Sequence, residues 1–286
     1  MIKIFKWIGI VFMVLVLFYY WGRPLPIEMR EEYYPCVVYY RKVHWAPNLM
    51  IAHILTVDLT CKQVEMFATP PDRPRGDAQL DARKTSEFVN QYELTFAVNG
   101  DAFHPWHSDF PFDFYPHALD DVQPYGISAS QGEMYGGDLG IPLYFSDKDE
   151  ASFERPIRKV YNAISGTNWL IHYGILNPDL NDRTLAPRTA VGLDSGGTKL
   201  IIVVVDGRQP FYSNGATIQE TAELMQLYGG ENAILMDGGG SSTLVIRDPK
   251  TGKAKVMNSP IDLGVPGRER YIANHLGGWI RPSEGD

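Results

Sequence analysis

A carboxylate and three glycines stand together at residues 237–240, directly behind the apolar run of residues 233–236. An apolar run of this length predicts a buried strand, so Asp237 lies where the strand leaves the core and the backbone turns sharply. Glycines let a ligand approach the main chain, and their successive N–H groups could point at an anion such as phosphate. A tight turn between two strands explains the same residues without any ligand.

Two further segments carry charged residues to the ends of predicted strands. The apolar, β-branched runs of residues 188–193 and 199–205 are joined by an Asp/Ser/Gly turn and predict a β-hairpin. Arg188 begins this hairpin, and Asp206 and Arg208 follow its end. Because antiparallel strands bring their outer ends to one edge of a sheet, the hairpin can present these charges on a single rim.

Two more polar segments extend the pattern. The short apolar run of residues 96–98 predicts a strand that ends in Asn99, Gly100 and Asp101. Near the C-terminus, residues 267–277 combine arginines with Asn274 and His275. Polar groups at several strand ends indicate a site more strongly than one glycine turn does.

Taken in this order, the segments resemble the phosphodiester glycosidase domain family, which includes the lysosomal enzyme that uncovers mannose 6-phosphate and many bacterial envelope proteins. The resemblance covers roughly residues 90 to 280, and several ordered blocks are harder to meet by chance than one glycine motif. The chain departs from the family at Asp101, where the family usually has a second glycine. The matching blocks are residues 99–100, 126–128, 131–132, 163–166, 188–192, 206–208, 215–217, 237–242 and 270–277.

The resemblance implies hydrolysis of a sugar 1-phosphodiester at the glycosidic C–O bond, which releases the sugar and leaves a phosphomonoester. This reaction needs positive charge on the departing phosphate and a carboxylate near the oxocarbenium-like carbon. The expected catalytic residues are Asp237, Asp206, Asp101 and Arg188. The two carboxylates Asp237 and Asp206 would share the roles of nucleophile or stabiliser and of base for water. The expected substrate-binding residues are Asn99, Gly166, Thr167, Arg208, Gly238, Gly239, Gly240, Ser241, Ser242, Arg270, Asn274 and His275.

Other interpretations use the same residues. Each aspartate could form only an Asx turn or a strand-end salt bridge. A phosphodiesterase that cuts the P–O bond would use the arginines together with a metal cluster. A noncatalytic glycan-binding protein of polysaccharide assembly would keep the aromatic segment of residues 104–117, whose rings can stack on sugars. We expect no required cofactor, and the sequence leaves open a calcium ion near the acidic strand ends.

Length and composition agree with an enzyme domain. The chain has 286 residues, of which 44% are hydrophobic, and we expect a single domain over residues 23–286. Its expected fold class is α+β, with mixed, mostly antiparallel sheets around one or more helices. One helix is expected at residues 219–228, where Thr217 and Glu220 fit a capping box. The net charge of −8 argues against a nucleic-acid partner.

The N-terminal residues indicate in which cellular compartment the catalytic domain lies. Residues 4–21 are apolar apart from Lys6, end in Tyr19, Tyr20 and Trp21, and are followed by Arg23, which predicts a signal anchor over residues 1–22. A cleaved signal peptide is the alternative. We therefore expect a membrane-anchored catalytic domain outside the cytoplasm, periplasmic or extracellular, acting on an envelope or exopolysaccharide glycan. Cys36 and Cys61 could form a disulfide there or remain buried thiols.

Overall fold

The computed structural model describes residues 2–73, 79–110, 113–155 and 159–281. Within these residues the chain forms antiparallel sheets and the helices α1 (Ile2–Trp21), α2 (Thr85–Gln91) and α3 (Ile218–Leu227). The expected α+β class is therefore confirmed, with strands as the dominant element. Of the expected aromatic segment at residues 104–117, residues 111 and 112 lie outside the described part.

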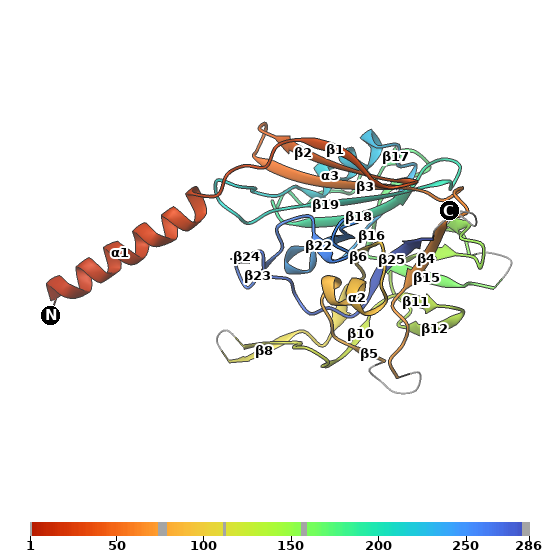
Figure 1. The fold of residues 1–286 in the computed structure, drawn as a ribbon, viewed down its shortest axis with the longest axis horizontal. Coiled ribbons are helices and arrows are strands. Elements are labelled where there is room, and N and C mark those ends of the chain that lie inside the picture. The colour runs from red at the N-terminus through yellow and green to blue at the C-terminus, as the bar shows by residue number, and fades with distance from the viewer. Residues whose placement is uncertain (1, 74–78, 111–112, 156–158, 282–286) are drawn as a thin grey trace.

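The largest sheet has eight strands and forms one layer of the body (Figure 1). In spatial order its strands are β1 (Met29–Tyr34), β2 (Val37–His44), β3 (Met50–Asp58), β19 (Lys199–Val205), β18 (Arg188–Leu193), β20 (Asn232–Leu235), β16 (Asn168–His172) and β17 (Ile175–Leu176). The predicted hairpin is confirmed, because β18 and β19 pair antiparallel from Arg188–Val205 to Leu193–Leu200.

Two five-stranded sheets face this layer. The first contains β22 (Ala254–Val256), β21 (Leu244–Arg247), β6 (Phe96–Asn99), β25 (His275–Ile280) and β4 (Val64–Ala68). The second contains β12 (Glu133–Gly136), β11 (Ile127–Ser130), β15 (Asn162–Gly166), β13 (Ile141–Phe145) and β14 (Ala151–Ser152).

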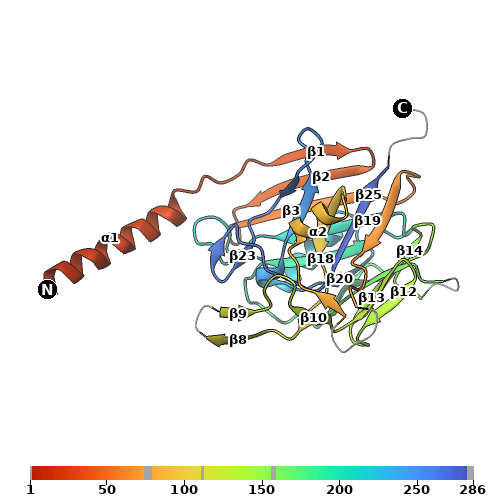
Figure 2. The same ribbon diagram turned by 60° about the horizontal axis from the view of Figure 1, so that its bottom comes forward.

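Smaller sheets border the site. A three-stranded sheet contains β5 (Leu80–Asp81), β10 (Asp121–Pro124) and β7 (Phe103–His104). The hairpins are β8 (His107–Phe110) with β9 (Asp113–Tyr115), and β23 (Ile261–Asp262) with β24 (Val265–Pro266). Figure 2 shows the first hairpin reaching out from the body beside β10.

Strand β19 shows why the large sheet is buried on both faces. Its side chains alternate, and Leu200, Ile202 and Val204 enter the core between the sheets. The side chains of Ile201 and Val203 point the other way, into a second core that includes residues of α3. An uninterrupted apolar strand is what two covered faces require, and the charged residues come only where the strand ends.

The polar strand ends meet at one end of this arrangement. Because β18 and β19 are antiparallel, the first residue of β18 lies beside the last residue of β19. The end of β20 lies at the same edge, since Met236 N–H donates to the Thr189 carbonyl at 2.9 Å. Asp237 N–H donates to the Gly100 carbonyl at 3.1 Å, which joins this edge to the end of β6. Segments far apart in sequence are thus brought together by strand register within the large sheet and by a hydrogen bond between the two sheets.

Helix α1 extends away from the sheets (Figure 1). The sequence predicted a membrane-spanning anchor here, and the segment is helical over Ile2–Trp21. However, no helix in the described part of the chain combines the length and apolar character needed to cross a membrane. The predicted transmembrane helix is therefore not supported.

Cys36 and Cys61 form a disulfide. Cys36 precedes β2 and Cys61 follows β3, and these two strands pair antiparallel from Val37–Val57 to His44–Met50. The bridge therefore closes the outer end of a hairpin, which resolves the alternatives that the sequence left open for the two cysteines.

The capping box of α3 is confirmed and gives a stability prediction. Thr217 Oγ1 accepts from Glu220 N–H at 3.0 Å, and Glu220 Oε2 accepts from Thr217 N–H at 2.8 Å. We expect Thr217→Ala to lower the free energy of unfolding by about 1 kcal/mol, measured by urea denaturation. Thr217→Ser keeps the capping oxygen and serves as the control, and equal losses in both variants would contradict the capping role.

Candidate active site

A cavity of about 550 Å³ opens where the polar strand ends meet. It is lined by Ala102, Phe103, Trp106, Tyr125, Ala186, Arg188, Arg208, Asp237, Gly238, Gly239, Gly240 and Arg270. Three arginines and one aspartate thus share a single cavity in a protein whose net charge is −8. Such a concentration of guanidinium groups suits a small anionic ligand, phosphate above all.

Two of the arginines are held in place by aspartates. Arg188 Nη2 lies 2.9 Å from Asp182 Oδ2 and also donates to the Thr184 carbonyl at 2.8 Å. Arg270 Nε lies 2.8 Å from Asp262 Oδ1. Hydrogen bonds from Thr184, with a smaller contribution from the Arg188 guanidinium, lower the pKa of Asp182 to about 2, so this partner stays ionised. These pairs fix the direction of each guanidinium while part of it still faces the cavity.

Arg208 differs from the other two. Among the described residues, its guanidinium forms no hydrogen bond or ion pair. Its backbone has φ 57°, in the left-handed region that a non-glycine residue enters only at a cost of order 1 kcal/mol. A cation that no described residue pairs, held at a strained position on a cavity wall, has capacity to bind an anion.

Asp237 is half-buried and lines the cavity. Its Oδ1 accepts from Gly238 N–H at 3.0 Å. Burial raises the pKa of the Asp237 carboxyl, while a hydrogen bond with Ser241 and the charge of Arg270 act in the opposite direction. This is the carboxylate that lies among the three arginines.

Asp101 lies beside this cavity, in a smaller one. Asp101 and Thr167 line a hollow of about 250 Å³ that shares Ala102 and Tyr125 with the larger cavity. The Asp101 carboxylate accepts from Gly126 N–H at 2.6 Å and from Ala102 N–H at 2.8 Å. Burial, with a smaller contribution from Asp237, raises the pKa of Asp101 to about 7 despite these hydrogen bonds.

The glycine turn differs from the predicted anion cradle. Gly238 N–H donates to Asp237, and Gly239 N–H donates to the Pro187 carbonyl at 2.9 Å. Two of the three predicted phosphate-binding N–H groups are therefore already occupied. The glycines instead make room for arginines: a Cβ at position 240 would lie 2.5 Å from Arg270 Nη2, and one at position 239 would lie 3.1 Å from Arg208 Nη1.

Several residues expected to contact substrate do not line either cavity. Asp206 is fully buried and makes hydrogen bonds with His53, Asn258 and Ser259. Asn99 is also fully buried, and its amide donates to the Asp237 carbonyl at 2.8 Å. The sequence identified both as polar residues at strand ends but did not reveal that their side chains turn inward.

The predicted residues at the start of β25 are buried as well. Asn274 Oδ1 accepts from Asp101 N–H at 2.9 Å, and its Nδ2 donates to Ser128 Oγ at 3.0 Å, so Asn274 orients the backbone that carries Asp101. His275 is fully buried, with its ring stacked on Phe88 at a centroid distance of 4.6 Å. Burial lowers the pKa of His275 well below its ordinary value, so the ring is neutral.

The remaining predicted residues support the walls. Ser241 Oγ accepts from Arg270 Nη1 at 3.4 Å, and the Ser242 carbonyl accepts from Asn258 Nδ2 at 3.0 Å. Gly166 packs so closely against β20 that a Cβ there would lie 2.5 Å from the Leu235 carbonyl oxygen. Thr167 N–H donates to that same carbonyl at 2.7 Å.

Aromatic rings form the outer wall. Trp106 and Tyr125 are about half exposed, at 50% and 43%, and both line the cavity. Arg270 lies over the Trp106 ring at 5.2 Å. The sequence singled out the aromatic segment but missed Tyr125, whose only signal is its position directly before the matching block at residues 126–128. It also missed Asp182 and Asp262, which gain their meaning from arginines distant in sequence.

A metal centre was an open alternative. Among the residues that the structure describes, no group of three or more His, Cys, Asp or Glu side chains is arranged to hold a metal ion. His117 instead lies between Asp113 Oδ1, at 2.8 Å, and Asp120 Oδ2, at 3.1 Å, on the exposed hairpin.

Comparison with sequence families gives one match over most of the chain. The model described as phosphodiester glycosidase matches residues 92–278. A curated relative, the SPbeta prophage-derived uncharacterized protein YomE of Bacillus subtilis (strain 168), is 45% identical over 90 residues. That match covers 32% of this chain and 12% of the relative, so the chain spans only a small part of that protein's length.

Solved structures share the fold. The catalytic domain of zebrafish N-acetylglucosamine-1-phosphodiester alpha-N-acetylglucosaminidase, auto-inhibited by its pro-peptide, matches with a TM-score of 0.58 and 19% identity. The alignment covers 90% of this chain and 84% of that one. A hypothetical protein from Synechocystis matches with a TM-score of 0.57 and 13% identity, covering 90% of this chain and 64% of that one.

The contact between Gly240 and Arg270 gives a prediction. In Gly240→Ala the new methyl group would displace the flexible end of Arg270, so the fold should persist while the guanidinium leaves its position. We expect the dissociation constant for inorganic phosphate, measured by calorimetric titration, to rise about tenfold, the effect of one charge-assisted hydrogen bond. Gly196→Ala, in an exposed turn, is the matched control, and equal phosphate affinity in both variants would show that Arg270 is not a ligand.

Proposed function

The chain belongs to the phosphodiester glycosidase family, and from this premise we propose that it hydrolyses the glycosidic C–O bond of a sugar 1-phosphodiester. The observation that carries the proposal is the convergence of Arg188, Arg208 and Arg270 with Asp237 in one cavity. A phosphodiester brings one negative charge to three guanidinium groups, of which only Arg208 lacks a carboxylate partner within the described chain.

In the proposed mechanism the arginines bind the phosphate oxygens. As the C–O bond breaks, its electron pair passes to the bridging oxygen, and the phosphomonoester that leaves carries an additional negative charge. Guanidinium groups already positioned at that oxygen stabilise the charge as it develops. Because a phosphate is a good leaving group, little proton donation to it is required.

The carboxylates act on the sugar side. Asp237 stabilises the positive charge on the anomeric carbon, or attacks that carbon as the nucleophile. Asp101 removes a proton from the water that adds to the carbon, and its pKa of about 7 suits a base near neutral pH. The sugar then occupies the smaller hollow lined by Asp101, Tyr125 and Thr167, next to the phosphate. Asp206 and Asn99 act in this scheme only by holding the walls.

The proposed setting is outside the cytoplasm, in the periplasm or the extracellular space. The disulfide between Cys36 and Cys61 supports an oxidising compartment. The half-exposed rings of Trp106 and Tyr125 suit a saccharide chain that continues beyond the cavity. An envelope or exopolysaccharide glycan with a phosphodiester link is therefore the substrate class we propose.

Isotope labelling tests the bond that breaks. The full chain is incubated with a panel of sugar 1-phosphodiesters in oxygen-18 water, and we expect the label on the released sugar. Asp237→Asn should lower kcat by about 10²-fold or more, whereas Asp248→Asn, in an exposed turn where it binds Lys250 N–H, should not. Label on the phosphate would show that the P–O bond breaks and that the protein is a phosphodiesterase. No turnover of any substrate in the panel would favour a noncatalytic glycan-binding protein.

The pH dependence tests the base. Because Asp101 must be ionised to accept a proton, kcat/KM should increase with pH and level off above about 7, the pKa of its carboxyl. Asp101→Asn should abolish this increase of kcat/KM with pH, the acidic limb of the profile, and lower kcat/KM by about 10²-fold. Burial also raises the pKa of Asp149, to about 6, but Asp149 binds Met66 N–H outside the cavity, so Asp149→Asn should keep the limb. An activity that instead falls through pH 7 would make Asp101 an acid.

A further inference from the structure

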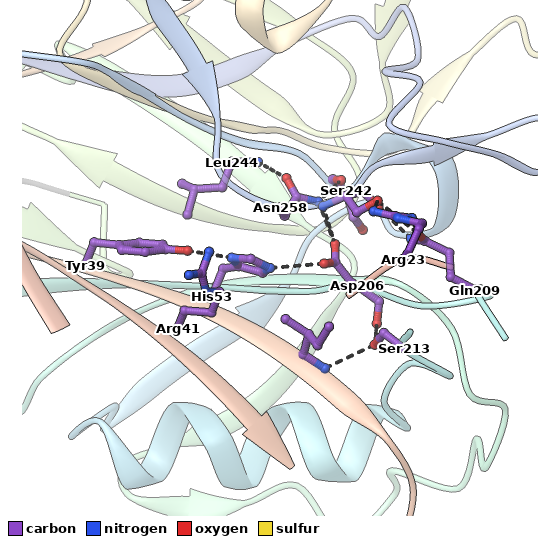
Figure 3. Close-up of polar contacts among 12 residues, drawn as sticks. Arg23, Tyr39, Arg41, His53, Asp206, Gln209, Ser213, Ser242, Leu244 and Asn258 are labelled. Atoms are coloured by element: carbon purple, nitrogen blue, oxygen red, sulfur yellow. Dashed lines mark hydrogen bonds and ion pairs between the residues drawn. The ribbon is translucent and has the colours of Figure 1, made fainter. Parts of the chain in front are cut away.

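A buried hydrogen-bonded chain runs behind Arg208. Two residues before it, the fully buried Asp206 carboxylate receives Ser259 N–H at 2.7 Å and Asn258 Nδ2 at 3.2 Å, and it lies 3.1 Å from His53 Nε2 (Figure 3). Removing a carboxylate from water costs several kcal/mol unless hydrogen bonds replace the lost solvation. With three such partners, Asp206 is held in a single orientation.

His53 connects Asp206 to the outer strands. It lies on β3, fully enclosed, with the Tyr39 hydroxyl 2.7 Å from Nδ1 (Figure 3). Burial raises the pKa of Tyr39, so the hydroxyl keeps its proton and can donate it to Nδ1. The other ring nitrogen then carries hydrogen and donates to Asp206, and every polar atom of the ring is satisfied. A histidine between the buried apolar residues Ala52 and Ile54 is thereby explained.

Arg23 forms the outer end of the same chain. Its Nη1 donates to Gln209 Oε1 at 2.6 Å and its Nη2 donates to Ser259 Oγ at 3.0 Å. The guanidinium also lies over the Tyr212 ring at 4.0 Å. Gln209 follows Arg208 directly. The segment of residues 206–209 is therefore fixed at its first residue by the hydrogen bonds of Asp206 and at its last residue by the hydrogen bond from Arg23 to Gln209.

The chain also reaches the glycine turn. Asn258 Nδ2, which donates to Asp206, donates in addition to the Ser242 carbonyl at 3.0 Å. Asn258 Oδ1 accepts from Leu244 N–H at 2.9 Å, so the exit of the turn is fixed against the same group. One network therefore holds both the segment that carries Arg208 and the wall that Arg208 faces at Gly239.

We propose that Arg23, His53 and Asp206 are positioning residues for the anion site, which act through Arg208 and do not touch the substrate. The inference rests on the proposed function in that the anion is the phosphate of the substrate. Arg208 needs such support because its own guanidinium has no partner in the described residues and its backbone is strained. Loosening the network should weaken anion binding before it affects the chemistry of the carboxylates.

Arg23 offers the sharpest test, because it is only half-buried and its substitution leaves the core intact. In the full chain, Arg23→Gln should raise both the dissociation constant for inorganic phosphate and KM about fivefold, the worth of roughly one hydrogen bond, with little change in kcat or Tm. Arg23→Lys can still donate to Gln209 and should recover part of the affinity. The matched control is Arg30→Gln, which removes another arginine–tyrosine contact, that with Tyr40 at 5.7 Å.

His53→Gln and Asp206→Asn test the buried part of the chain. We expect larger losses of phosphate affinity in the folded fraction, accompanied by a lower Tm. Asn162→Ala is the control: it removes a fully buried amide that donates to the Met66 carbonyl at 2.8 Å in another sheet, so it should lower Tm without changing phosphate affinity.

Each outcome bears on the proposal. Unchanged phosphate affinity in Arg23→Gln, or in the folded fraction of the two buried variants, would reduce the network to a stabilising role and overturn the proposal. If the wild-type chain binds no inorganic phosphate, the cavity is not an anion site and the proposal falls with it. Phosphate binding that weakens as expected, without turnover of any sugar phosphodiester, would support the positioning role while rejecting the glycosidase.

Discussion

The buried amide of Asn99 is the junction on which the site depends. Its Nδ2 donates to the Asp237 carbonyl, while its Oδ1 accepts from Thr189 Oγ1 at 2.8 Å and from Thr243 N–H at 3.1 Å. These partners belong to β18 and to both sides of the glycine turn, whereas Asn99 itself ends β6 of the facing sheet. One side chain thus fixes the separation of two sheets where their polar ends meet, and no apolar residue could satisfy the same backbone groups.

The charge of the cavity depends on which of its three arginines are paired with a carboxylate. Asp182 and Asp262 hold Arg188 and Arg270, which sets the geometry of two guanidinium groups and offsets much of their charge. Arg208 contributes charge without a carboxylate partner in the part of the chain that the structure describes. Asp101 and Asp237 are poorly solvated, and this burial raises the pKa of both carboxyl groups. In such an environment the attraction between the arginines and a bound anion is stronger than in water. An acidic protein can therefore present a locally cationic cavity.

The sequence predicted the segments of the site better than the direction of their side chains. Apolar periodicity placed Asp237, Arg188 and Asn99 at strand ends, and register then brought those ends together. It did not show that Asp206 and Asn99 turn into the core while Asp237 turns outward, because that choice depends on the turn that follows each strand. His53 carried a signal of its own, a polar ring within an apolar strand, but its partners Tyr39 and Asp206 are identified only by three-dimensional packing. The N-terminal helix was placed correctly, whereas its assignment as a membrane span was not supported.

The position of β25 has a consequence for how the protein matures. This strand, His275–Ile280, lies inside its sheet between β6 and the edge strand β4, and Arg270 immediately precedes the segment that leads into it. Its partners belong to residues 64–99, so the pairing spans most of the chain. Until β25 has been synthesised and inserted, β6 lacks one neighbour, and the edges of β4 and β6 are exposed to pairing with other chains. The polypeptide is therefore most prone to self-association before this late strand closes the sheet.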